Sequence, residues 1–177
     1  MKKLNYLNLA MMVLCTGFSF TSCGEEEEPT STIDPVISPQ EWVTDEYTGT
    51  TFTDLDSRGM VMHIDTTYNQ PLIISKNEQG LLMLTYPNWT DHQGMSYGDF
   101  QILPLEAIAT TDGVILQGIC TDSLYKAGTG YPATLRATGV IKGEDTHKQA
   151  DLTLNIDLVV SPKMTLKFTL KYEGFNI

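Results

Sequence analysis

Apolar and polar residues alternate one by one along much of this chain, and this period of two constrains the fold more than any other feature. The clearest example is the segment 152–158, in which leucine or isoleucine occupies every second position. The segment 164–172 repeats the pattern after the short, proline-containing turn 161–163. Two alternating strands around a short turn are typical of an antiparallel hairpin with one buried and one solvated face. The carboxyl end therefore predicts a hairpin whose even-numbered residues face a core.

The same period recurs from Tyr47 onward, and no segment has the period of about 3.6 residues that indicates an amphipathic helix. The alternating segments are 47–53, 60–66, 72–75, 81–86, 100–109, 114–120, 134–141, 152–160 and 164–172. About nine strands with turns between them predict an all-β fold, an antiparallel up-and-down meander. Closing the meander removes its exposed edges, so we expect a β-barrel of about eight or nine strands. An open sandwich with Greek-key connections is the alternative.

Turn signals predict which of these strands are partners. Polar residues and glycines lie at 77–80, at Asp112-Gly113 and at 143–149. Gly, Asn and Asp in such positions favour tight turns between paired strands. We therefore expect three further hairpins, which join 72–75 to 81–86, 100–109 to 114–120, and 134–141 to 152–160.

Charge and composition exclude some classes of function. The 177 residues include 22 acidic and 11 basic side chains, a formal net charge of −11. Nucleic-acid binding requires clustered Lys and Arg, so we expect no nucleic-acid partner. Apolar residues make up 41% of the chain, enough for one packed core.

The amino terminus predicts a targeting signal over residues 1–22. Lys2 and Lys3 precede an apolar stretch, and small residues then lead to Cys23. The tetrapeptide Phe20-Thr21-Ser22-Cys23 resembles a bacterial lipobox. That resemblance implies cleavage before Cys23, lipidation of its thiol and amine, and attachment to a membrane through acyl chains. An ordinary signal peptide with an incidental cysteine is the alternative.

The residues after Cys23 predict an extended tether over 23–46. The acidic run Glu25–Glu28 repels itself, and prolines at 29, 35 and 39 stiffen the stretch that follows. The run also resembles the acidic surface-export signal of Bacteroidetes lipoproteins, which implies an outer-membrane protein that faces the cell exterior. A plain hydrophilic tether is the alternative. Trp42 and Val43 are the expected first contacts with the folded domain, which we place at 47–177.

Several strand segments together carry a resemblance to a known group. They are Tyr47-Thr48-Gly49-Thr50, Leu72-Ile73-Ile74, the run 113–118 and the closing hairpin 151–169. Together they look like the calycin-like β-barrel domains of Bacteroidetes lipoproteins, although the Gly-x-Trp motif of true lipocalins is absent. The resemblance implies a lipocalin-like barrel on a lipid anchor, in a group that has no common activity and defines no catalytic residues.

We find no motif that predicts catalysis or metal binding. The chain has no Gly-x-Ser-x-Gly elbow, no phosphate-binding loop and no His-Glu-x-x-His. His63 and Asp65 are expected to share one strand face, but two ligands are too few for a closed zinc site. Cys120 lies in an apolar run and is expected to be a buried thiol. We therefore expect no catalytic residues, no metal and no cofactor.

Two segments rich in aromatic residues are the candidate ligand-binding site. The first, 86–98, carries Trp89, His92 and Tyr97, and the second, 121–132, carries Tyr125 and Tyr131. Amphipathic aromatic side chains on loops are typical of binding surfaces. One hypothesis places all five around one barrel mouth. In the alternative, Trp89 and Tyr97 fold back and plug the end of the barrel.

These observations favour a non-catalytic lipoprotein of the outer membrane or cell surface. Its β-barrel would bind a small apolar molecule, a glycan or a peptide. The alternative is a structural or assembly component of the cell envelope that acts through protein–protein contact. Asp65-Thr66-Thr67 and Asp122-Ser123-Leu124 also resemble the O-glycosylation motif of exported Bacteroidetes proteins.

Overall fold

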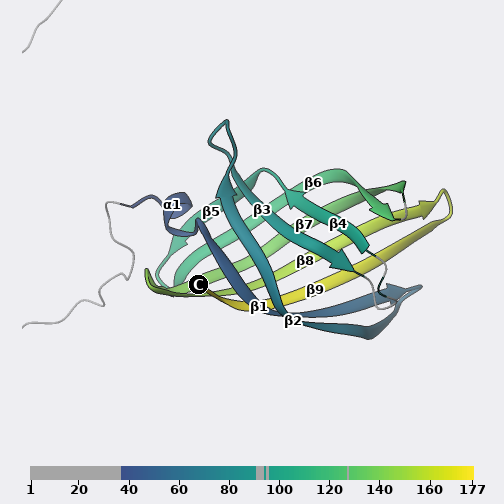
Figure 1. Ribbon diagram of the computed structural model, residues 1–177, viewed down its shortest axis with the longest axis horizontal. Helices are drawn as coiled ribbons and strands as arrows, with labels where there is room; N and C mark the ends of the chain where they lie inside the picture. The colour runs from purple at the N-terminus through teal and green to yellow at the C-terminus, as the bar shows by residue number, and fades with distance from the viewer. Residues whose placement is uncertain (1–36, 91–93, 95, 127) are drawn as a thin grey trace, which may run out of the picture. The chain divides into compact units, whose positions relative to one another are not determined.

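The computed structural model describes residues 37–90, 94, 96–126 and 128–177, which belong to one compact unit. Within these residues the fold is all-β, with one short helix, α1 (Pro39–Trp42), before the strands (Figure 1). The strands are β1 (Asp45–Ser57), β2 (Met60–Lys76), β3 (Leu82–Thr90), β4 (Ser96–Ile102), β5 (Leu105–Thr110), β6 (Gly113–Lys126), β7 (Thr129–Glu144), β8 (His147–Ser161) and β9 (Met164–Asn176).

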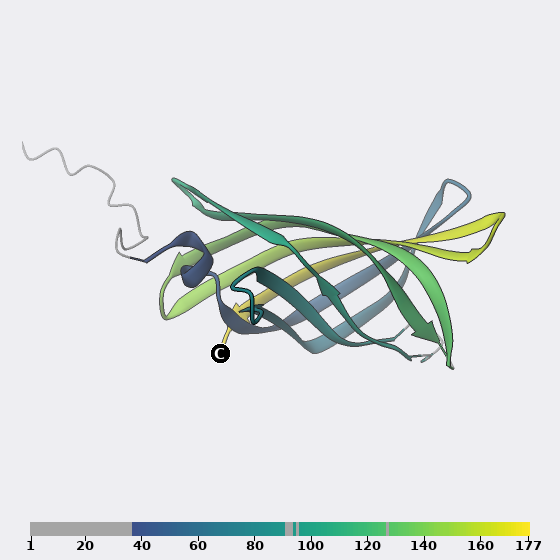
Figure 2. The ribbon, with the colours of Figure 1, turned by 90° about the horizontal axis from the view of Figure 1, so that it is seen from above.

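All nine strands form one antiparallel sheet in the order β4-β3-β2-β1-β9-β8-β7-β6-β5. The sheet is strongly curled into a half-barrel, as two perpendicular views show (Figures 1 and 2). The predicted all-β, up-and-down antiparallel fold is confirmed, and the shape is consistent with a calycin-like domain. The hydrogen-bonded ladder itself stays open between β4 and β5, the two edge strands.

The two edges of the sheet approach each other because β4 and β5 are consecutive in the chain. Only Leu103 and Pro104 separate them. Across this gap the Cys120 thiol of β6 donates to the carbonyl oxygen of Gln101 on β4, at 3.3 Å. A side chain at Gly118 would lie 2.9 Å from the carbonyl oxygen of Pro104, so the glycine permits this close approach. β6 therefore contacts β4 across the gap between the two edge strands.

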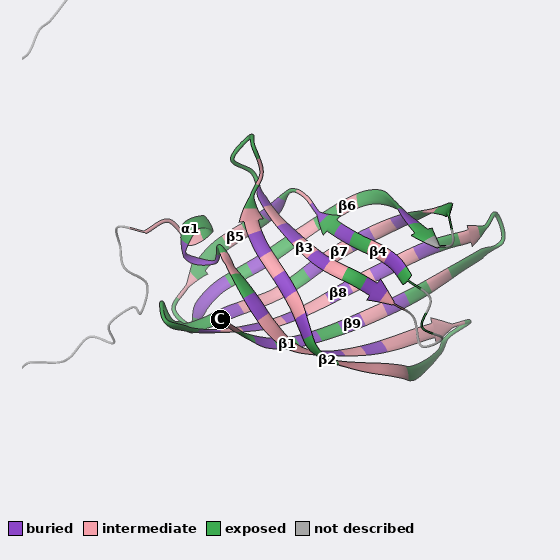
Figure 3. Cartoon of the chain, viewed as in Figure 1, coloured by how far each residue is buried: buried purple, intermediate pink, exposed green. Residues whose placement is uncertain are grey.

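The predicted hairpin at the carboxyl end has the expected register. Leu154 pairs with Leu170 and Ile156 pairs with Phe168, and all four side chains are buried on the inner face. The other predicted hairpins correspond to β2–β3, β5–β6 and β7–β8. Buried and more exposed positions alternate along these strands (Figure 3).

The prediction of one strand over 100–109 was wrong. The chain leaves the β3 ladder after Ile102 and joins the β6 ladder at Leu105. Pro104 has no N–H to donate to either ladder, and the chain changes partners there, although Pro71 and Pro132 are accommodated within β2 and β7. The segments 60–66 and 72–75, predicted as separate strands, are instead the two halves of β2.

A bulge corrects the expectation that His63 and Asp65 share a face. His63 pairs with Asp54 on β1, whereas Asp65 pairs with the buried residue Thr53. The register shift leaves Ile64 as the extra residue, so His63 faces outward and Asp65 faces inward. A bulge inserts one residue and thereby reverses the alternation beyond it.

Side chains fill the inside of the half-barrel. The largest buried ones are aromatic: Trp42, Tyr47, Tyr86, Trp89, Phe100 and Tyr172. The hydroxyls of the three tyrosines have local partners, as in Tyr86, whose hydroxyl donates to Thr51 at 3.0 Å. Burial raises the pKa of Tyr86 to about 12, so this phenol stays neutral and acts as a donor. The inner face is thus a packed core.

The folded unit begins before Tyr47, inside the range 23–46 that we expected to be a tether. Ser38 caps α1 through a reciprocal contact with Glu41. Trp42 and Val43 are buried, as first contacts with the folded domain should be. Lys148, only 7% exposed, lies 3.1 Å from Asp45 and 5.5 Å from the Trp42 ring centroid. Residues 37–46 therefore pack as part of the domain.

Candidate functional site

Two of the five predicted binding residues lie inside the fold. Trp89 is 1% exposed and Tyr97 is 5% exposed. Their rings stack with centroids 4.6 Å apart. The Trp89 ring also meets Phe100 of β4 and Phe168 of β9 edge-on, at 5.1 Å in the case of Phe168. Both side chains are therefore buried, as expected from the alternative hypothesis in which Trp89 and Tyr97 plug the end of the barrel.

The other predicted residues are not gathered into one site. Tyr125 is 61% exposed and packs on Gly130, where an added Cβ would lie 3.1 Å from its ring. Tyr131 is half-buried and pairs with the buried residue Leu124, so it faces inward while Tyr125 faces outward. His92 lies outside the described residues.

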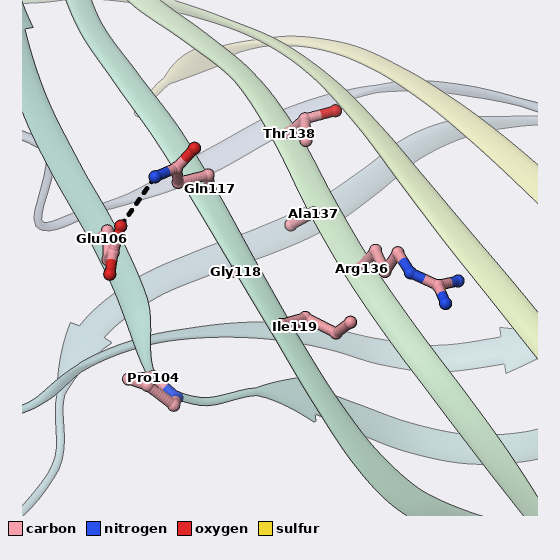
Figure 4. A pocket seen from close by; sticks show the side chains of 8 residues that line it. All are labelled: Pro104, Glu106, Gln117, Gly118, Ile119, Arg136, Ala137 and Thr138. Carbon is pink, nitrogen blue, oxygen red and sulfur yellow. Dashed lines mark hydrogen bonds between the residues drawn. The ribbon is translucent and has the colours of Figure 1, made fainter.

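A groove that sequence reasoning missed lies on the outer face of β5, β6 and β7. Its volume is about 280 Å³. It is lined by Pro104, just before β5, and by seven residues of the three neighbouring strands (Figure 4): Glu106, Gln117, Gly118, Ile119, Arg136, Ala137 and Thr138. Glu106 accepts a hydrogen bond of 2.7 Å from the Gln117 amide, which fixes both side chains on one wall.

A second groove of about 320 Å³ adjoins the first at Arg136. It crosses the outer face toward β1 and is lined by Asp54, Asp56, Val61, Arg136, Asn155, Asp157, Lys167, Phe168 and Thr169. Arg136 donates to Asp157 at 2.7 Å, and Thr169 donates to Asn155 at 3.1 Å. The two grooves, which we call the outer grooves, therefore present held guanidinium, amide, carboxylate and hydroxyl groups.

The only sequence feature that could have indicated the outer grooves is the set of polar residues at every second position of the strands. Asn155, Asp157, Lys167 and Thr169 are the residues that separate the buried leucines and Phe168. A polar outer face is also what any solvated strand has. Only the packing of neighbouring strands distinguishes a groove from an ordinary surface, and that packing has no local sequence signature.

A polar cluster lies at the β1 end of the second groove. Asp54 Oδ1 lies 3.1 Å from His63 Nδ1, and Asp54 Oδ2 lies 3.2 Å from Lys171 Nζ. Desolvation acts to raise the pKa of Asp54, but the hydrogen bonds and charges of His63 and Lys171 lower it overall. The carboxyl is thus held in its ionised form.

His63 Nε2 lies 2.9 Å from Thr66 Oγ1, so the cluster has the order carboxylate, imidazole, hydroxyl. That order also occurs in nucleophilic triads, which in addition need donors for a developing oxyanion. Here the amide of Thr66 donates to Asp65 Oδ1 at 2.8 Å. The backbone donor of Thr66 itself is therefore engaged, and we interpret the cluster as a structural network.

Metal sites and membrane-spanning helices were also sought in the described part of the chain. There, no group of three or more His, Cys, Asp or Glu side chains is placed to hold a metal ion. None of the helices within those residues is long and apolar enough to cross a membrane. Burial raises the pKa of the Cys120 thiol, the opposite of what a reactive thiolate requires.

Comparisons with known proteins add no family to this picture. No family model, no curated protein and no solved structure matches the chain.

Proposed function

We propose that this chain is a non-catalytic, lipid-anchored protein of the outer membrane that faces the cell exterior and binds a polar ligand in its outer grooves. The observation that carries this proposal is the contrast between the two faces of the sheet. The inner face is filled by side chains such as Trp89 and Phe168, whereas the outer face is hollowed, with polar groups beside a mostly apolar lining in the first groove and a more polar lining in the second. A ligand therefore has room outside the half-barrel and none beside Trp89.

A glycan is the ligand class that fits this lining best. Carboxylate, amide and guanidinium groups each offer two hydrogen-bonding atoms in one plane. Adjacent hydroxyls on a sugar ring present the matching pair. Glu106, Gln117 and Arg136 supply such groups along the first groove, and Asn155 and Asp157 continue them into the second. A small apolar ligand would leave these groups unpaired.

The placement in the envelope rests on the amino-terminal residues. Cys23 follows a positively charged start and an apolar run, and the Glu25–Glu28 run follows at once. Several acyl chains on Cys23 would hold the protein at a membrane, which one chain does poorly. The acidic run would then direct it to the outer surface.

The test uses the arginine that the two grooves share. We expect Arg136→Ala to lower binding to an array of envelope and host glycans at least tenfold, because every ligand that spans both grooves passes Arg136. Lys142→Ala is the matched control: Lys142 is an exposed residue of the same strand and lies outside both grooves. Equal binding by the two variants, at equal melting temperature, would refute the glycan site.

One observation favours the second candidate, an envelope component that acts through protein contact. Ile108 and Ile115 pair across β5 and β6 and are 47% and 42% exposed. β5 is an edge strand, and an apolar edge is a common site of protein–protein contact. Cross-linking in whole cells that is lost on Ile108→Lys but retained in Arg136→Ala would favour this candidate.

A further inference from the structure

The ends of two neighbouring hairpins expose apolar side chains to solvent. They are Met60 (68% exposed), Val61 (68%) and Met62 (48%) in β2, and Val159 (38%) and Met164 (49%) in β8 and β9. We call these five residues the hairpin-end surface. β1 and β9 are paired as far as Asp56 and Lys167, so the two hairpins are adjacent.

This surface breaks the alternation that the rest of the sheet obeys. Met62 pairs with Leu55 on the inner face, whereas Val61 pairs with Asp56 on the outer face. Three consecutive apolar residues are thus exposed on both sides of one strand. A core covers only one face of a strand, so packing within this sheet does not account for the run. Exposed apolar runs of this length mark a surface that something else covers.

Basic residues accompany the apolar ones. Arg58 lies in the β1–β2 turn, and Lys163 lies in the β8–β9 turn. Together with Lys167 and Met164 they line one recess of about 280 Å³, in which Asp56 is the acidic member. The chain as a whole has a net charge of −11, so a basic, apolar end is a local reversal of its charge. Such a combination matches an anionic lipid surface.

The geometry suits contact with a flat surface. Both turns lie at the same end of the half-barrel and extend its sheet there (Figures 1 and 2). The β6–β7 hairpin reaches the same end and carries the exposed side chain of Tyr125. Tyrosine, with an apolar ring and a polar tip, is favoured at the boundary between lipid and water.

We propose that the hairpin-end surface inserts into the headgroup region of an anionic lipid membrane. This inference rests on the proposed lipid anchor for its setting. Thirteen residues separate Cys23 from Ile37, and a chain of that length can reach at most about 45 Å. β1 is 13 residues long and therefore spans about 43 Å. A tether from Cys23 is thus long enough for the anchor and the hairpin ends to meet one bilayer.

The test measures the quenching of a tryptophan placed in the hairpin-end surface, so membrane contact of the amino-terminal segment alone does not produce the signal. Met62→Trp and Tyr68→Trp are made in the full chain, and each is mixed with vesicles of 70% phosphatidylcholine and 30% phosphatidylglycerol that contain brominated acyl chains. Tyr68 is the matched control because it lies in the same strand and is 71% exposed. Buried Trp42 and Trp89 are common to both variants.

We expect the tryptophan of Met62→Trp to be quenched at least twice as strongly as that of Tyr68→Trp. Arg58→Glu with Lys163→Glu should abolish the difference, and vesicles of phosphatidylcholine alone should reduce it. Met164→Trp is a second reporter if Met62→Trp melts below the parent chain. Equal quenching at positions 62 and 68 would overturn the proposal. So would a stable dimer in solution that Met62→Glu dissociates, since a second copy would then cover the surface.

These outcomes are separate from those of the proposed function. Loss of glycan binding in Arg136→Ala concerns a residue outside the hairpin-end surface and its recess. Release of Cys23→Ser from membranes concerns the anchor. Quenching at position 62 is compared only with quenching at position 68, so it stands or falls whichever way those two experiments end.

Discussion

Trp89 decides between a binding rim and a packed plug, and its replacement by Ala gives the sharpest test of the fold. The side chain is 1% exposed and touches aromatic rings from β4 and β9 as well as Tyr97. We therefore expect Trp89→Ala to destabilise the domain strongly. A rim residue would leave stability almost unchanged.

The expected magnitude follows from burial. Replacing a buried Phe or Trp by Ala costs about 3–5 kcal/mol, because contacts are lost and a cavity remains. For a chain of this size each kcal/mol lowers the melting temperature by about 2–4 °C. The expected drop is thus roughly 6–20 °C. Trp89→Phe should cost much less, because it keeps an aromatic ring and removes the Nε1 donor, which has no hydrogen-bond partner among the described residues.

The assay is thermal unfolding followed by circular dichroism, with Tyr125→Ala as the control. Tyr125 was predicted in the same aromatic rim but is 61% exposed, so its loss should move the midpoint by no more than a few degrees. A shift in Trp89→Ala as small as that in Tyr125→Ala would refute the plug. It would mean that the ring contacts of Trp89 with Tyr97 and Phe168 contribute nothing to stability.

Three further predictions concern Lys148 and the amino-terminal residues. Lys148→Ala should cost about 1–3 kcal/mol in urea unfolding, because it leaves Asp45 without the buried partner 3.1 Å away; Lys142→Ala, on the surface, should cost almost nothing. Cys23→Ser should move the protein from the detergent phase to the aqueous phase, and retention in detergent would place the anchor elsewhere. Replacing Glu25–Glu28 by Ala should keep the protein lipidated but protect it from protease added to whole cells; unchanged cleavage would reduce the run to a tether.

The sequence predicted best those elements in which one strand follows its partner directly. The β8–β9 hairpin has its expected register because a slip of one residue would expose every leucine on its inner face. The period of two and the turn residues are local signals, so they survive without knowledge of the rest of the fold. The same reasoning identified β5–β6 and β7–β8.

The predicted number of strands, nine, agrees with the structure only because two errors cancel. Two errors compensated: β2 joined two predicted strands, and Pro104 divided another into β4 and β5. Pro104 marks the division locally, but Pro71 and Pro132 lie within β2 and β7, so a proline alone does not predict where a strand ends. The two predicted strands form one continuous β2 because β1 pairs with β2 along almost the whole length of β1. That pairing is a non-local property.

The candidate site was the least predictable part, because the sequence alone does not show whether an aromatic side chain faces a ligand or the core. Trp89 and Tyr97 were chosen for their side chains, yet the sheet closes around them. Conversely, the outer grooves consist of Asn, Asp, Thr and Arg positions that alternate with leucines and look like ordinary solvated residues. The grooves form only because seven strands, from β2 to β5 in the order of the sheet, lie side by side.

A filled interior changes where selection for function can act. Residues such as Leu154 and Phe168 are committed to packing, and any change there alters the stability of the whole domain. The polar outer positions and the hairpin ends are free of this constraint, because their side chains do not pack in the core. Met60, Val61 and Met62 are therefore informative: a chain that only had to fold and stay soluble gains nothing from three exposed apolar residues at a strand end. Their presence is best explained by a surface that they meet.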